Sequence, residues 1–230
     1  MKTRNFWNGY YYMINYILNT TSIPNLSEEK PKKIIVLCHG YGGDGKDISS
    51  LALNWQRFLP EVIFLCPDAP EICQVNPQGY QWFDLSSDKE EIILEKSLEA
   101  EKKLSIFLDQ VLDNYNLQPE DLALVGFSQG CMMILQLGLK KKEKVNCILG
   151  YSGKIINQRN LSENIISKPK IFLMHGEKDT IVSPTCLLEA KEYLKNKGIK
   201  IKIKLFKNCE HKIPVEGSSL GLDFLRKNLL

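Results

Sequence analysis

Short, uninterrupted apolar runs recur along the chain and predict buried strands. They cover residues Ile34 to Cys38, Val62 to Cys66, Leu122 to Val125, Cys147 to Tyr151 and Ile171 to Met174. Runs without polar alternation are typical of strands that are buried on both faces of a parallel sheet. The segment from Ile199 to Phe206 alternates isoleucine and lysine instead, which predicts a half-exposed strand.

Longer segments with helical spacing separate these runs. The clearest spans Asp88 to Leu112, where leucines recur close to one face of a helix. Ser87 and Glu90 have the spacing of a capping box at its start.

A later helix is predicted to start with Ser183 as the N-cap and Pro184 at the first helical position, and to stop at Gly198. Strands that alternate with helices predict an α/β fold with a mostly parallel central sheet and helices on both faces. We expect one domain over residues 1–230, with an N-terminal edge strand or hairpin in residues 1–30.

Composition and charge narrow the function classes. A formal charge of +3, from 30 basic and 27 acidic residues, is too balanced to indicate binding to nucleic acid. The seven cysteines lack Cys-x-x-Cys spacing and are expected to be reduced, mostly buried thiols. Polar residues interrupt the first 19 positions, and no run approaches the ~20 apolar residues of a membrane span. We therefore expect a cytoplasmic protein without integral membrane association.

The pentapeptide Gly-Phe-Ser-Gln-Gly at positions 126–130 lies between a predicted buried strand and a helix-like stretch over Cys131 to Leu139. In this context the pattern Gly-x-Ser-x-Gly predicts a nucleophile elbow, a sharp strand-to-helix turn that exposes the serine hydroxyl. Ser128 is therefore the candidate nucleophile. Cys131, three residues later, is expected to pack against the sheet rather than to act as a redox thiol.

A serine hydroxyl needs a general base, and a carboxylate must hold that base in the correct tautomer. The histidines of the chain are His39, His175 and His211. In α/β hydrolases the triad follows the chain order Ser, Asp or Glu, His. The base is therefore His211, unless Glu143 or Glu163 serves as the acid for His175.

Asp179 is the candidate acid because it is the only aspartate between Ser128 and His211. It follows the predicted strand 171–174, at the carboxyl end of the sheet where such sites are built. Glu177 remains the close competitor.

The glycine-rich segment His-Gly-Tyr-Gly-Gly at positions 39–43 follows the first predicted buried strand. This is where the fold supplies one of two backbone donors for a tetrahedral intermediate. We expect these donors to be the N–H groups of Tyr41 and Gln129, with His39 bracing the loop. A phosphate cradle is disfavoured because the segment lacks the spacing of phosphate-binding loops. No ligand cluster for a metal is evident, and the chemistry requires neither metal nor cofactor.

Together these motifs resemble the phospholipase/carboxylesterase family of α/β hydrolases, which includes the acyl-protein thioesterases. The resemblance rests on His39-Gly40, Pro67-Asp68-Ala69-Pro70, Trp82-Phe83-Asp84, the 126–130 pentapeptide, His175-Gly176 with Asp179, and His211, and it covers roughly residues 32–228. Many relatives carry a glycine where this chain has Cys131 and a Gly-Leu-Gly loop where it has Gly40-Tyr41-Gly42.

The resemblance implies hydrolysis of esters or thioesters of modest acyl chains through an acyl-enzyme on Ser128. The substrate would be a small acyl ester, a lysophospholipid or an acylated protein, and the enzyme a monomer or homodimer. Trp82 and Phe83 would either shape the acyl pocket or pack in the core, and Tyr41 would narrow the entrance. The alternatives are an amide or peptide hydrolase on the same fold and, less favoured, a non-catalytic ligand-binding protein.

Overall fold

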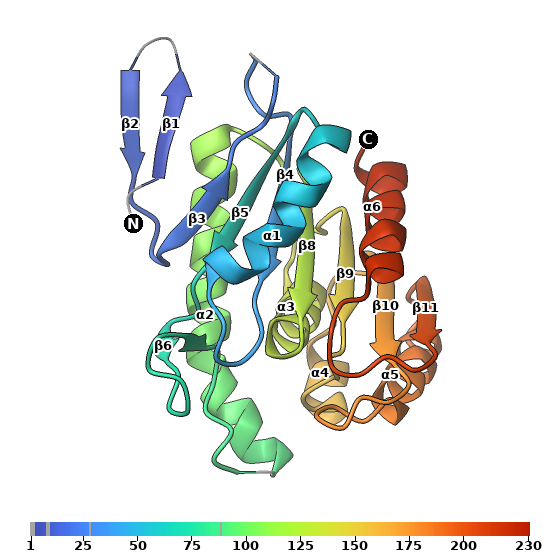
Figure 1. Cartoon of the computed structure of the whole chain (residues 1–230). Helices are drawn as coiled ribbons and strands as arrows, with labels where there is room; N and C mark the ends of the chain where they lie inside the picture. The colour runs from blue at the N-terminus through green and yellow to red at the C-terminus, as the bar shows by residue number, and fades with distance from the viewer. Residues whose placement is uncertain (1–2, 8–9, 28, 88) are drawn as a thin grey trace.

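A central sheet of seven strands organises the chain (Figure 1). The computed structural model describes residues 3–7, 10–27, 29–87 and 89–230, with side chains from residue 15 onward. The strand order is β11-β10-β9-β8-β4-β5-β3. The strands are β3 (Thr20–Ile23), β4 (Lys33–Cys38), β5 (Val62–Pro67), β8 (Leu122–Phe127), β9 (Cys147–Tyr151), β10 (Lys170–Gly176) and β11 (Ile201–Phe206). All neighbouring pairs are parallel except β3 with β5, as the α/β prediction requires.

Both faces of this sheet are covered, which explains why its strands are continuously apolar. On β4, Ile34 and Val36 pack into one core cluster, whereas Ile35 and Leu37 pack into the other. All four side chains are fully buried. Successive residues of a strand point to opposite faces, so two apolar cores demand an apolar residue at every position.

Helices form the outer layers. They are α1 (Gly45–Trp55), α2 (Glu90–Tyr115), α3 (Gln129–Lys140), α4 (Gln158–Asn164), α5 (Thr185–Asn196) and α6 (Val215–Leu229). In Figure 1, α1 and α6 lie in front of the sheet, and α2 and α3 lie behind it. The two core clusters divide in the same way: one takes buried residues of α1 and α6, and the other takes those of α2, α3 and α5.

The predicted helix starts were wrong in detail. Helix α2 begins at Glu90 with Lys89 as the N-cap, and the Ser87 hydroxyl accepts the Lys89 N–H at 3.2 Å, so the capping box does not form. Asp88, where this helix was expected to begin, lies outside the described residues. The helix also continues three residues beyond Leu112, because the cap depends on local backbone geometry that spacing alone does not reveal.

Helix α5 likewise starts one residue later than predicted. Its N-cap is Pro184, without a side-chain capping bond. Ser183 instead forms a local turn in which its hydroxyl oxygen accepts the Thr185 N–H at 3.4 Å. Gly198 follows the end of the helix with a φ of +70°, a conformation that glycine adopts without strain.

The N-terminal part forms a hairpin of β1 (Thr3–Trp7) and β2 (Tyr10–Ile14), followed by the edge strand β3. Asp68, just after β5, secures this edge: its carboxylate accepts the Asn19 side-chain amide and, at 2.8 Å, the Gly45 N–H at the start of α1. A small hairpin, β6 (Glu71–Ile72) with β7 (Tyr80–Gln81), follows β5 in the chain.

Candidate functional site

Ser128 stands at the junction of β8 and α3 in a strained backbone conformation. Its φ of 51° and ψ of −117° lie in a region that non-glycine residues rarely occupy. The Ser128 N–H donates to the Tyr151 carbonyl of the neighbouring strand at 2.8 Å, which helps to hold the turn. The geometry matches the strand–turn–helix context of a nucleophile elbow.

The two glycines that flank Ser128 are required by close backbone contacts. A Cβ on Gly126 would lie 2.6 Å from the Gly130 carbonyl oxygen, and a Cβ on Gly130 would lie 2.2 Å from the Cys38 carbonyl oxygen. Real Cβ atoms do not approach oxygen this closely. The turn is therefore tight because α3 starts directly against the ends of β8 and β4.

His211 lies next to Ser128, although the two residues are 83 positions apart in the sequence. Its Nε2 lies 3.0 Å from the Ser128 Oγ, within hydrogen-bonding distance. The Phe127 ring packs against the imidazole, with the ring centroids 4.9 Å apart. His211 lies on the loop between β11 and α6, and its side chain is 18% exposed, so the imidazole is partly accessible to solvent.

Asp179 completes a continuous hydrogen-bonded chain. Its Oδ2 accepts from His211 Nδ1 at 2.7 Å, and its Oδ1 accepts from the amides of Ile181 and Val182, each at 2.9 Å. Burial of the Asp179 carboxylate opposes its ionisation, but the bonds from His211 and the two amides outweigh this and lower its pKa. An ionised Asp179 assigns the Nδ1 proton to His211 and leaves Nε2 free to accept a proton from Ser128.

The competing carboxylates lie elsewhere. Glu177 is exposed, and its carboxylate accepts the Asn208 N–H at 3.4 Å. Glu143 and Glu163 are also exposed. His175 contacts Asp179 rather than either of these two glutamates in the part of the chain that the structure describes.

The glycine-rich loop after β4 lies beside Ser128. A Cβ on Gly40 would lie 3.3 Å from the Ser128 Cβ. The loop is held from outside, because the Gly42 N–H donates to the Tyr80 carbonyl at 2.9 Å and the Tyr80 N–H donates to Gly43 at 2.8 Å. Among the described residues, the N–H groups of Tyr41 and Gln129 have no hydrogen-bond partner, so both are available to an incoming oxygen.

His39 braces this loop, as the sequence predicts. The Ala69 N–H donates to His39 Nε2 at 2.9 Å, so the proton is on Nδ1, which donates to the Gly40 carbonyl at 2.7 Å. Burial lowers the pKa of His39 and favours this neutral tautomer. The Tyr41 side chain is half-buried, and its pKa is raised by burial and by a hydrogen bond with Cys73.

Trp82 and Phe83 are fully buried and expose no surface to a cleft. Of the two roles considered for them, they therefore fit packing in the core. Their backbone is joined to the elbow by the Gln129 side chain. Its Oε1 accepts the Trp82 N–H at 2.8 Å, and its Nε2 donates to the Phe83 carbonyl at 2.7 Å. The Trp82 indole N–H also donates to the His39 carbonyl at 3.0 Å. The Trp82-Phe83 segment is therefore bonded both to the residue after Ser128 and to the glycine-rich loop. Cys131 is likewise buried, as predicted.

Sequence reasoning missed two supporting side chains, those of Gln129 and His175. The sequence indicates only the Gln129 backbone, because nothing in the pentapeptide shows that its side chain reaches residues 46 and 47 positions earlier. His175 was considered only as an alternative base. The signals for it were its position directly after the predicted strand 171–174 and its place in the His175-Gly176 pair of the family resemblance.

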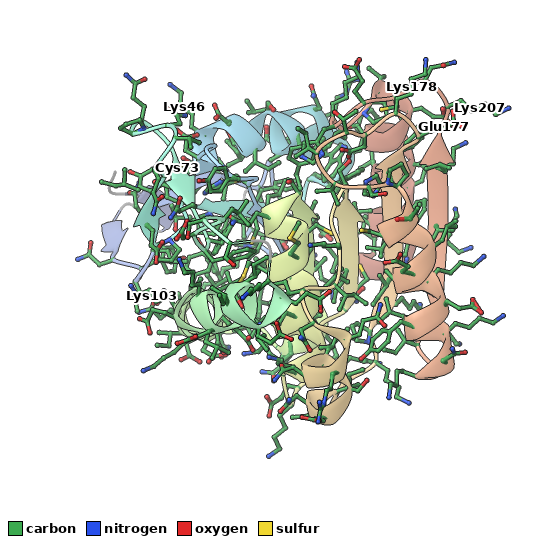
Figure 2. All side chains as sticks on the ribbon, turned by 90° about the horizontal axis from the view of Figure 1, so that it is seen from below. Lys46, Cys73, Lys103, Glu177, Lys178 and Lys207 are labelled. Carbon is green, nitrogen blue, oxygen red and sulfur yellow. The ribbon has the colours of Figure 1, made fainter. Side chains whose placement is uncertain are left out.

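The candidate site lies at the carboxyl end of the parallel strands. In Figure 1 the arrows of β8 and β10 point down, toward this end, and Figure 2 shows the molecule from below. In this view Glu177, Lys178 and Lys207 lie on one side, and Lys46 and Cys73 on the opposite side. The loops after β10 and β11 thus lie on the opposite side of this end from the start of α1 and the loop after β6.

The described residues contain no group of three His, Cys, Asp or Glu side chains that could hold a metal ion. Within the same residues, no helix has the length and apolar character needed to cross a membrane.

Comparison with known proteins gives a consistent result. The model of the family Phospholipase/Carboxylesterase matches residues 21–229. The chain is 29% identical to acyl-protein thioesterase 1 of Gibberella zeae, a match covering 85% of this chain and 90% of the relative. It is 24% identical to esterase YpfH of Escherichia coli K12, covering 87% and 85%. A crystal structure of esterase PE8 superposes with a TM-score of 0.88 at 36% identity, covering 92% of this chain and 99% of the other.

Proposed function

The chain belongs to the phospholipase/carboxylesterase family and is a hydrolase of ester or thioester bonds, and we propose that it cleaves them through an acyl-enzyme on Ser128. The observation that carries this proposal is the unbroken chain from Asp179 Oδ2 to His211, at 2.7 Å, and from His211 to Ser128 Oγ, at 3.0 Å. A nucleophile, a base and a group that orients the base are the parts required for acyl transfer.

In the proposed cycle, Ser128 Oγ attacks the acyl carbonyl carbon while His211 Nε2 accepts its proton. Asp179 stays ionised and stabilises the imidazolium. The tetrahedral intermediate then collapses, the bond to the alcohol or thiol breaks, and His211 returns the proton to the leaving group. Water, deprotonated by His211, attacks the acyl-enzyme; the bond to Oγ breaks, His211 returns the proton to Ser128 Oγ, and the acid leaves.

The developing oxyanion would be held by the N–H groups of Tyr41 and Gln129. The available Gln129 amide belongs to the first turn of α3, where the helix dipole also favours negative charge. Tyr41 lies next to Gly40, which contacts Ser128 closely. Loss of one such donor typically costs about 10²–10³-fold in kcat.

The proposed substrate class is an acyl ester or thioester of modest chain length, whether a small ester, a lysophospholipid or an acylated protein. The relatives include an acyl-protein thioesterase and an esterase, which supports both a thiol and an alcohol as the leaving group. Tyr41, half-buried beside the site, is proposed to narrow the entrance.

The test measures hydrolysis of p-nitrophenyl esters from short to medium acyl chains, with an acyl thioester and a p-nitroanilide in parallel. Wild type, Ser128→Ala and His211→Ala are compared, each with a fluorophosphonate probe. The exposed helical serine of α1 supplies a matched control, Ser50→Ala. We expect ester and thioester turnover and probe labelling in wild type and control. We expect both to be lost in Ser128→Ala, and kcat to fall at least ~10²-fold in His211→Ala.

Two outcomes contradict the proposal. A folded wild type that neither turns over esters nor labels would favour a ligand-binding protein. Faster cleavage of the anilide than of the ester would favour the amide hydrolase.

A further inference from the structure

A second histidine contacts the acid of the proposed triad. His175, near the end of β10, places its Nε2 3.1 Å from Asp179 Oδ2, the same oxygen that accepts from His211. Its side chain is 1% exposed and that of Asp179 is fully buried. The contact therefore lies in the core, where water does not compete for it.

The proton on His175 can be assigned from its partners. Nε2 also lies 2.9 Å from the Val182 carbonyl oxygen, which can only accept. Nε2 must therefore carry a hydrogen, which it donates to this carbonyl while the Asp179 carboxylate oxygen lies 3.1 Å away. Nδ1 is buried and has no partner among the described residues. Burial lowers the pKa of His175 although the Val182 carbonyl and Asp179 favour its charged form, so the ring is neutral.

The two oxygens of Asp179 are held differently. Oδ1 accepts two backbone amides, those of Ile181 and Val182. Without His175, the donor to Oδ2 would be His211 itself. In the proposed mechanism, His211 is the group that this carboxylate orients. His211 lies on a loop with an 18% exposed side chain, whereas His175 belongs to a buried strand.

We infer that His175 is a positioning residue, whose Nε2–H fixes Asp179 Oδ2 independently of His211 and so holds the base in line with Ser128. This inference rests on the proposed function. If the Asp179 carboxylate can move, His211 moves with it and samples unproductive orientations. Displacements of about 1 Å can lower rates by ~10²-fold. A group that acts in this way changes kcat more than KM, because it does not touch the substrate.

The experiment compares His175→Gln, His175→Asn and His175→Leu with wild type. Glutamine places an N–H donor where His175 has Nε2, asparagine is too short to reach Asp179, and leucine cannot donate. We measure kcat and KM on a p-nitrophenyl ester and the melting temperature of each variant. We expect His175→Gln to keep kcat within about threefold. We expect His175→Leu and His175→Asn to lose about 10- to 100-fold in kcat, with KM within about threefold of wild type.

A wild-type kcat in folded His175→Leu or His175→Asn overturns the inference, as does a His175→Gln variant that is folded yet as slow as these two. If His175→Leu does not fold, the polar pair of glutamine and asparagine still decides. A wild type without turnover or labelling is a different result, because it rejects the proposed function and the inference with it.

Discussion

Ser128 has a backbone conformation that costs a non-glycine residue about 1–3 kcal/mol. The surrounding structure imposes it through the Tyr151 carbonyl, which accepts the Ser128 N–H, and through the glycine contacts on either side. The side chains around Ser128 are similarly over-determined: Asp179 accepts from two backbone amides and from His211, and His175 Nε2 lies 3.1 Å from its Oδ2. At this scale, the site consists of groups whose positions are held by several partners each.

Replacing the acid tests this arrangement. In Asp179→Asn, the side-chain amide presents a donor either to His211 Nδ1 or to the amides of Ile181 and Val182, all of which are donors themselves. We expect His211 to adopt the wrong tautomer and kcat for ester hydrolysis to fall by about 10³–10⁴-fold, measured at neutral pH. Circular dichroism serves as the folding control. A folded variant with more than a tenth of wild-type kcat would remove Asp179 from the proposed mechanism.

At the scale of elements, the site depends on how closely α3 approaches the sheet. The helix begins immediately after Ser128, and its first turn touches the end of β4 through Gly130. The same approach positions the Gln129 side chain to bind the backbone of the Trp82-Phe83 segment. Beyond that segment, Asp84 bonds Lys96 of α2, and this bond lowers the pKa of Asp84 to about 2. The N-terminus of α3 thus connects Ser128, β4 and the loop that contains Trp82 and Phe83.

Substituting Gly130→Ala tests this contact. The new Cβ would lie 2.2 Å from the Cys38 carbonyl oxygen, and backbone cannot yield as a flexible side chain would. We expect the free energy of unfolding, measured in urea, to decrease by about 1–3 kcal/mol. Gly43→Ala is the matched stability control, since its Cβ would have no contact shorter than 3.4 Å. Equal stability of both variants would show that the start of α3 is not constrained by β4.

At the scale of the whole molecule, the two core layers enclose most of the cysteine thiols. Of the seven cysteines, all free, six are buried and only Cys186 is partly exposed. Burial raises the pKa of the Cys131 thiol to about 12 and also raises the pKa of the Cys38, Cys66, Cys147 and Cys209 thiols, so these groups are neutral and unreactive at physiological pH. The redox state of the surroundings should therefore have little influence on the folded protein.

Alkylation checks this conclusion. We expect iodoacetamide at pH 7.5 to modify native protein at Cys186 alone, measured by peptide mass spectrometry, and to modify all seven thiols in guanidinium. Cys186→Ser should abolish native labelling. The melting temperature should not change with added reductant. Rapid labelling of Cys131 in the folded state would show that the core around α3 opens and that its thiol is available for chemistry.

The sequence by itself determined the buried strands, the α/β class and the identity of the three residues that meet at the site. Continuous apolar runs indicate strands that are buried on both faces of a sheet. The chain order of serine, acid and histidine leaves few possible assignments of the three residues. Helix caps were predicted less well, because Ser87 and Ser183 could satisfy several nearby amides and spacing does not decide which.

Only the tertiary structure decided how residues distant in sequence contact one another. It places Glu177 in solvent and Asp179 against His211, although the two carboxylates are two positions apart. It also buries Trp82 and Phe83 in the core and sets His175 beside Asp179. Such contacts follow from the path of the backbone after each strand, which depends on packing across the whole sheet rather than on local residue preferences.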